Sequence, residues 1–174
     1  TILSSCASRQ LEEVTFRRTV IPVQELLDAA GKYFKKLMKN RSERIELEIE
    51  PMEAKVIGDV NQLRFLLENL IDEALTVRED GVIRLQARKD NEYIRFLFTD
   101  TRREKSVEEL NQLFYPNLAR MTSGEKGELR GTEYLVCKQI IRDHDEFAGR
   151  RGCRINAEPA EGGGFTVYFT IPRR

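Results

Sequence analysis

Three stretches of the sequence place apolar residues at every second position, strictly so in the first, and this pattern constrains the fold more than any other feature. They are residues 44–50, 83–87 and 94–98. Successive side chains of a strand point to opposite faces, so each stretch predicts a strand with one buried face. Asp90-Asn91 lies between the last two stretches and indicates a turn, which predicts an antiparallel hairpin.

The remaining elements follow from helical spacing and turn residues. One helix is expected to open at Pro22, a second at Asp59, which is a good N-cap, and a third after Gly131. Residues 56–57 predict a short strand, and residues 154–158 and 165–171 predict a second hairpin. The apolar positions that recur at helical spacing are Val23, Leu26, Leu27, Ala30, Tyr33, Phe34 and Leu37; Val60, Leu63, Leu66, Leu67, Leu70, Ile71 and Ala74; and Leu135, Val136, Ile140 and Ile141.

This order of elements predicts an α+β fold, a two-layer sandwich with one mixed sheet and helices on one face. The length of 174 residues suits one core. Residues 1–19 are expected to be the end of an upstream helical region and a linker, and residues 20–174 to be one domain. Because the chain begins at Thr1, we expect a piece of a longer protein, with any membrane anchor or sensor upstream. Residues 101–130 lack periodicity except for a short helix near 107–114 and predict a mobile, lid-like loop.

Composition narrows the classes of function. Lys+Arg and Asp+Glu are both 29, so nothing points to nucleic acid or to an anionic membrane surface. The three cysteines, Cys6, Cys137 and Cys153, are far apart and odd in number, which favours reduced thiols in a cytoplasmic domain. The single histidine, His144, makes histidine-based metal sites hard to build.

Several strings, taken in order, resemble one family. The string from Lys138 to His144, KQIIRDH, is similar to a family string K-Q-I-V-E-A-H without a gap, and GGGFTVYFTIP near the C-terminus is similar to G-x-G-T-x-F-x-F-x-L-P. With the helix opening at Asp59, these strings resemble the GHKL superfamily, in particular the C-terminal ATP-binding (HATPase_c-like) domain of bacterial sensor histidine kinases. The resemblance runs from about residue 20 to the C-terminus and implies that family's fold. An insertion at 145–151 lengthens a link that is short in the family.

The first nucleotide station that the resemblance implies lies on the Asp59 helix. The family pattern N-L-x-x-N-A-x-K matches Asn69 and Ala74, but Glu73 replaces the metal-binding asparagine and Thr76 replaces the phosphate-binding lysine. Asn69 and Glu73 are four residues apart and share a helical face, so both are candidate Mg²⁺ ligands. The alternative interpretation is a solvated acidic helix face.

The second station in the family is D-x-G-x-G, whose aspartate accepts a hydrogen bond from the adenine amino group. Asp100 is kept at the end of an alternating stretch, but Arg102 and Glu104 replace both glycines. Non-glycine residues rarely adopt positive φ, so this loop is expected to take another shape. The two side chains are also expected to fill space beside the base.

The last two stations are an aromatic string and a glycine-rich phosphate loop. Phe114 matches the family's aromatic position, with packing at a helix end as the alternative role. Of the loop G-x-G-L-G-L only Gly131 survives, followed by Thr132, Glu133 and Tyr134. A carboxylate at Glu133 is expected to repel polyphosphate. ATP and Mg²⁺ are therefore expected to bind weakly or not at all.

These observations favour a regulatory pseudokinase module of a two-component sensor histidine kinase. Two alternatives stay open: an active kinase domain that binds ATP-Mg through an altered site, or a histidine phosphotransferase-type protein with an inactive ATPase-like domain. His144 is expected to be structural, so an acceptor histidine would precede Thr1. The resemblance implies the upstream dimerisation helices of the same protein, in a homodimer, and a response regulator or partner kinase as partners. It also implies a cytoplasmic location, alone or as part of a membrane-anchored sensor.

Overall fold

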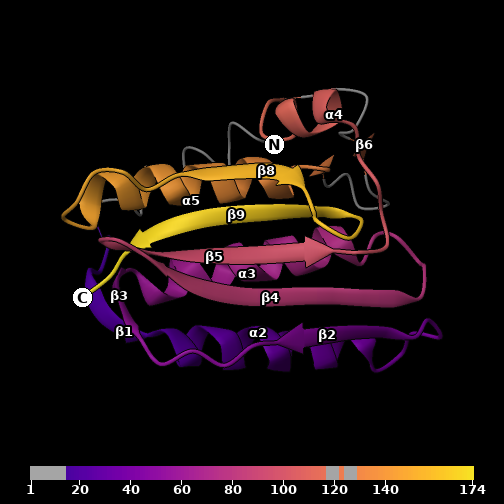
Figure 1. Ribbon diagram of the computed structural model, residues 1–174, viewed down its shortest axis with the longest axis horizontal. Coiled ribbons are helices and arrows are strands. Elements are labelled where there is room, and N and C mark those ends of the chain that lie inside the picture. The colour runs from indigo at the N-terminus through magenta and orange to yellow at the C-terminus, as the bar shows by residue number, and fades with distance from the viewer. Residues whose placement is uncertain (1–14, 117–121, 124–128) are drawn as a thin grey trace.

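The computed structural model describes residues 15–116, 122–123 and 129–174. Its main sheet has five strands in the order β2-β4-β5-β9-β8 (Figure 1). These strands are β2 (Ile45–Ile49), β4 (Gly81–Asp90), β5 (Tyr93–Asp100), β9 (Phe165–Pro172) and β8 (Ile155–Pro159).

The sheet is mixed, as the sequence predicts. β2 pairs with β4 in parallel, whereas β4–β5, β5–β9 and β8–β9 are antiparallel. Both predicted hairpins form, β4–β5 and β8–β9. Asn91 in the first turn has a φ of 53°, a conformation that asparagine tolerates better than most residues.

Three helices cover one face of the sheet, which confirms the predicted two-layer α+β architecture. They are α2 (Val23–Met38), α3 (Val60–Ala74) and α5 (Glu133–Phe147), which Figure 1 places together behind the strands. Their apolar stripes and the inward side chains of the strands form one core, in which Phe96 and Phe169 stack with ring centroids 4.8 Å apart. Asp59 caps α3 as predicted, because its side chain accepts a hydrogen bond from the Gln62 amide.

A small second sheet lies at the start of the domain. β1 (Thr19–Pro22) pairs antiparallel with β3 (Lys55–Gly58), and Thr19 is the partner of Gly58. Residues 19–22 therefore form a strand that the sequence did not indicate, and Thr19, which was expected to end the linker, is part of it. The interpretation of residues 1–14 as the end of a helix lies outside the described residues.

The segment 101–130 contains the short helix α4 (Val107–Asn111), near β8, and the two-residue strands β6 (Thr122–Ser123) and β7 (Leu129–Arg130) (Figure 1). Ser106 and Glu109 form a reciprocal capping box at the start of α4. The rest of the expected lid falls partly outside the described residues. Across the part of the chain that is described, no helix is both long and apolar enough to cross a membrane.

Candidate functional site

Asp100 lies at the end of β5 and is the centre of the candidate site. Its side chain is only 1% exposed. Oδ1 accepts hydrogen bonds from the Arg102 backbone amide (2.9 Å) and Nε (3.0 Å), while Oδ2 accepts from Arg102 Nη2 (3.0 Å) and Arg103 Nε (2.9 Å). A carboxylate offers about four lone-pair directions. The four donors therefore use the accepting capacity of Asp100.

The same contacts set the pKa of this carboxyl. Burial by itself raises the pKa, because it disfavours the charged form. The hydrogen bonds from the side chain and backbone of Arg102, with the positive charges of Arg103 and Arg102, outweigh burial and hold the pKa of Asp100 below its ordinary value. Asp100 is therefore an anion paired to two arginines.

Arg102 is as buried as its partner, with a side chain 1% exposed. Besides Asp100, its Nη1 donates to the carbonyls of Val77 and Glu79, both at 2.9 Å, and its Nη2 donates to that of Ala74 at 2.7 Å. All five N–H donors of the guanidinium are thus used. Because Ala74 is the last residue of α3, the arginine ties the end of this helix to the end of β5.

Arg103 continues the network toward α3. Its two terminal nitrogens bind the two carboxylate oxygens of Glu73, at 3.1 and 2.8 Å, in a bidentate pair. Burial lowers the pKa of Arg103, but the hydrogen bonds and charge of Glu73 more than offset this and raise it. The guanidinium also lies 5.2 Å from the ring centroid of Phe165.

Tyr134, in the first turn of α5, completes the cluster. Its hydroxyl donates to Oε2 of Glu73 at 2.5 Å, and its ring meets that of Phe114 edge to face at 5.6 Å. Burial and the negative charge of Glu73 raise the pKa of Tyr134, so the hydroxyl keeps its proton. The structure thus brings together Asp100, Glu73 and Phe114, three of the residues that the sequence singled out.

The turn formed by the three glycines packs against this segment. The Gly164 amide donates to Oε1 of Glu104 at 2.9 Å. Gly164 has a φ of +84°, and a Cβ there would lie 2.1 Å from the carbonyl oxygen of Asp100. Among the described residues the only non-glycine with positive φ is Asn91, so Arg102 and Glu104 avoid the glycine conformation, as expected from the sequence.

The other candidate residues make local contacts. The Asn69 amide donates to the Phe65 carbonyl of its own helix at 2.8 Å, one turn from Glu73. Thr76 lies beyond the end of α3, and its hydroxyl donates to the Glu73 carbonyl. Within the described residues no group of three or more His, Cys, Asp or Glu is arranged to hold a metal ion.

Gly131 and Thr132 lie just before α5. Gly131 has a φ of +81°, the conformation for which its lack of a side chain is suited. Thr132 is the N-cap residue of α5 but its side chain makes no capping hydrogen bond. The structure therefore places both at the N-terminus of α5, where the resemblance puts the phosphate loop.

His144 is completely buried near the end of α5. Its Nε2 accepts a hydrogen bond from the Asp59 amide at 3.1 Å, and Nδ1 lies 2.9 Å from the Ile140 carbonyl. Because an amide can only donate, the proton belongs on Nδ1, which donates to Ile140. A Cβ at Gly58 would lie 2.7 Å from Nε2, so this glycine lets β3 approach the ring.

The sequence indicated that Arg102 would fill space beside the base and left Arg102 and Arg103 as alternative phosphate-binding groups, with no internal partner for either. The structure makes these two arginines the groups that bind Asp100 and Glu73. A signal was present in the sequence: Arg102 stands where the family has a glycine and is followed by a second arginine, while Glu73 stands where the family has asparagine.

A family model described as histidine kinase-, DNA gyrase B-, and HSP90-like ATPase matches residues 58–174. The search of curated proteins gave no match. The catalytic domain of the histidine kinase ThkA is 21% identical over 90% of this chain and 97% of its own, with a TM-score of 0.69. ThkA has also been solved in complex with the response regulator TrrA, with 18% identity, a TM-score of 0.67, and coverage of 99% of this chain and 50% of that one.

Two other histidine kinases have the same fold. The mycobacterial sensor kinase MprB is 19% identical over 91% of this chain and 99% of its own, with a TM-score of 0.68. Full-length ShkA in complex with AMPPNP is 16% identical over 89% of this chain and 31% of its own, with a TM-score of 0.66. With the family model covering more than half of its residues, the chain belongs to the family of histidine kinase-, DNA gyrase B- and HSP90-like ATPases.

Proposed function

We propose that this chain is a regulatory module of a two-component histidine kinase, in which the ATPase fold is kept and ATP-Mg is not used. The observation that carries the proposal is the saturation of Asp100 by Arg102 and Arg103. In the family this aspartate accepts from the adenine amino group. Here an adenine would have to displace a charged, buried donor, and a neutral amino group does not replace that interaction.

The metal side of the site supports the same proposal. Glu73 stands where the family's metal-binding asparagine would be, and its carboxylate is bound by both terminal nitrogens of Arg103 and by the Tyr134 hydroxyl. Binding Mg²⁺ through Glu73 would leave Arg103 buried without its main counterion. The residues present therefore do not fit ATP-Mg.

The charge balance of the cluster also disfavours a polyphosphate. Asp100 and Glu73 supply two negative charges, and Arg102 and Arg103 supply two positive charges. Both arginines form ion pairs with these two carboxylates. Thr76 has no charge where the family has lysine, and Glu133 adds a negative charge in the first turn of α5. A net attraction for triphosphate is missing from this group of residues.

The partners proposed for this module are the dimerisation helices of its own longer protein, in a homodimer, and a response regulator or a partner kinase. The complex of ThkA with TrrA is one precedent for a family member that contacts a response regulator. In this proposal residues 20–174 form the module, residues 1–19 link it to the helices, and the signal passes through protein contacts. Such a module would work in the cytoplasm.

Calorimetric titration of the chain with ATP and Mg²⁺ tests the proposal. We expect no binding up to about 1 mM nucleotide, which corresponds to less than about 4 kcal/mol of binding free energy. ShkA, solved with AMPPNP, provides a positive control with that analogue. A dissociation constant below about 100 µM that weakens in Asp100→Ala, with the variant still folded by circular dichroism, would instead favour an active kinase domain with an altered site.

A further inference from the structure

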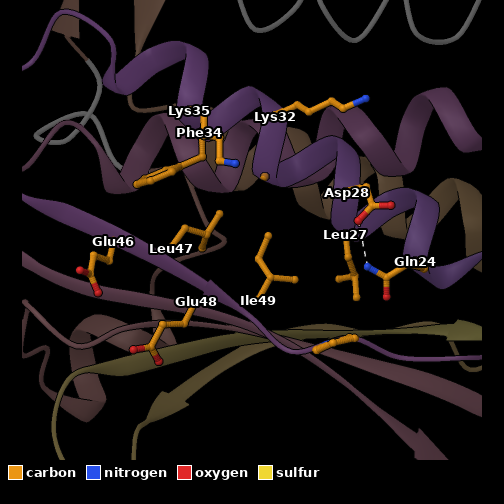
Figure 2. Close-up of a pocket in the computed structure, with 12 residues that line it drawn as sticks. Gln24, Leu27, Asp28, Lys32, Phe34, Lys35, Glu46, Leu47, Glu48 and Ile49 are labelled. Carbon is orange, nitrogen blue, oxygen red and sulfur yellow. Dashed lines mark hydrogen bonds between the residues drawn. The ribbon is translucent and has the colours of Figure 1, made fainter.

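A groove of about 750 Å³ runs between helix α2 and strand β2, away from the arginine cluster. Figure 2 shows Leu27 and Phe34 of α2 facing Leu47 and Ile49 of β2 across it. Leu47 and Ile49 are only half-buried, although they lie on the core face of the sheet. The floor of the groove is therefore apolar surface that the described elements leave partly exposed.

Gly31, in the middle of α2, keeps this groove open. A Cβ at this position would already lie 3.1 Å from Cδ1 of Ile49, so any longer side chain would project into the space. Glycine is the weakest helix former after proline, which makes its place inside a 16-residue helix a cost to stability. The missing side chain leaves room for another chain to approach Ile49 closely from outside.

β2 is an edge strand with backbone groups directed outward. The Gly81 amide donates to the Arg44 carbonyl, and the Glu50 amide donates to the Leu85 carbonyl. In a parallel ladder alternate residues of one strand make the bonds, so residues 44, 46, 48 and 50 face β4. The amides and carbonyls of Leu47 and Ile49 consequently point away from the sheet. Such an edge is a template for another strand.

The charges on the solvent face of this edge indicate what kind of strand fits, while Lys32 and Lys35 of α2 lie on the helix side of the groove. The outer face of β2 carries Glu46 and Glu48, followed by Glu50. The neighbouring strand β4 supplies two arginines that form ion pairs with this row. Nε of Arg84 lies 3.1 Å from Oε2 of Glu48, and Nη1 of Arg88 lies 3.0 Å from Oε1 of Glu50. Glu46 instead has Val82 as its cross-strand neighbour. A strand on the open side of β2 with basic side chains at alternate positions would place them beside the exposed carboxylates of Glu46 and Glu48.

We propose that β2 accepts an extended segment of a partner protein as an additional strand. The segment has apolar side chains at alternate positions, which enter the groove over Leu47 and Ile49, and basic side chains at the others, which lie beside Glu46 and Glu48. A second copy of this chain is a poor occupant, because pairing β2 with β2 would set the two rows of glutamates side by side. This surface is independent of the nucleotide site, so the proposal does not rest on the proposed function.

A capped peptide of alternating valine and lysine, titrated into the isotopically labelled chain and followed by NMR, tests the proposal. We expect saturable binding and slowed amide exchange at Leu47 and Ile49, with little change at Glu48, whose amide already faces β4. The control peptide has the same composition with the valines and lysines in separate blocks. Two further peptides carry N-methyl groups either on the valines or on the lysines, and one of the two should lose binding, since only alternate residues of a strand bond to β2.

Two variants locate the site on the protein. Glu46→Lys should lower the affinity for the valine–lysine peptide by about tenfold and raise the affinity for a valine–glutamate peptide. Glu53→Lys makes the same charge change outside the groove and should alter neither affinity by more than about twofold. Gly31→Leu should abolish binding while circular dichroism shows a folded chain. If Gly31→Leu unfolds the chain, the change in peptide affinity of Glu46→Lys still tests whether the peptide binds beside β2.

Four results would overturn the proposal. They are no binding at about 1 mM peptide, equal binding of the block-sequence control, equal binding of both N-methylated peptides, or a β2-mediated dimer of the chain by analytical ultracentrifugation without peptide.

Discussion

The hydroxyl of Tyr134 donates a 2.5 Å hydrogen bond to Oε2 of Glu73, which joins the first turn of α5 to the last turn of α3. Glu73 also holds Arg103, and Arg103 holds Asp100 at the end of β5. The end of β5, the end of α3 and the start of α5 are thereby connected by side-chain contacts.

Removing the tyrosine hydroxyl tests the strength of this connection. Tyr134→Phe keeps the ring against Phe114 but takes one donor from a charged carboxylate, so we expect a loss of about 1.5 kcal/mol in the free energy of unfolding. Urea denaturation gives the value. Tyr115→Phe is the matched control, because Tyr115 is 54% exposed and its change should stay within about 0.5 kcal/mol. Equal effects of the two variants would contradict a role for this hydroxyl.

Arg102 is expected to be the most sensitive charged residue of the cluster. Arg102→Ala leaves the buried Asp100 without its main partner and removes the donor to three carbonyls, so a loss of about 3–5 kcal/mol is expected. Arg102→Lys should recover little of this, because an ammonium does not reproduce the planar fork of five donors.

The control for this measurement is Arg84→Ala. Arg84 pairs with Glu48 on the exposed face of the sheet, where both side chains are about half exposed. Such a pair contributes at most about 1 kcal/mol. Should Arg102→Lys be as stable as the parent chain, charge alone would account for the site and the geometric explanation would be wrong.

The lowered pKa of Asp100 predicts an acid-dependent loss of stability. The folded pKa lies below the unfolded value of about 3.8, so the ionised carboxylate stabilises the fold above that pH. This contribution is lost as the pH falls below about 4 through the folded pKa. The difference in unfolding free energy between the parent chain and Asp100→Asn should therefore be largest near neutral pH and shrink in acid. A difference that stays constant between pH 7 and pH 3 would contradict the ion pair.

The architecture was predictable because it rests on periodicity. The alternation at 44–50, 83–87 and 94–98 and the helical stripes correctly indicated the sheet and its covered face. β1 was missed because Thr19–Pro22 is short and its partner β3 is more than 30 residues away. Pairing between distant short segments leaves no local pattern.

The site was predictable only as a set of substitutions. The sequence identified Asp100, Glu73 and Thr76 and the missing glycines, because these occupy fixed places in an ordered motif. It did not indicate that Arg102 folds back onto Asp100, since this contact depends on where α3 ends and where its carbonyls point. The charged residues Arg102 and Glu104 in place of glycines indicated an altered loop. Only the three-dimensional structure shows their partners, which are Asp100 for Arg102 and the Gly164 amide for Glu104.

The glycine turn before β9 offers a comparison of two positions with nearly the same backbone. Gly162 and Gly164 have φ values of +90° and +84°, so alanine is strained at both, by about 1–2 kcal/mol. At Gly162 nothing lies within 4 Å of an added Cβ, whereas at Gly164 the Asp100 carbonyl oxygen would be 2.1 Å away and Cα of Thr101 2.8 Å. Backbone atoms cannot rotate aside as a side chain does, so Gly164→Ala must shift the 100–104 segment that holds the arginine cluster. We expect Gly162→Ala to lower the free energy of unfolding by about 1 kcal/mol and Gly164→Ala to lower it by about 3 kcal/mol or more, as measured by urea denaturation. Gly164→Ala should also increase amide exchange at Arg102, and equal losses for the two variants would show that the turn does not support the site.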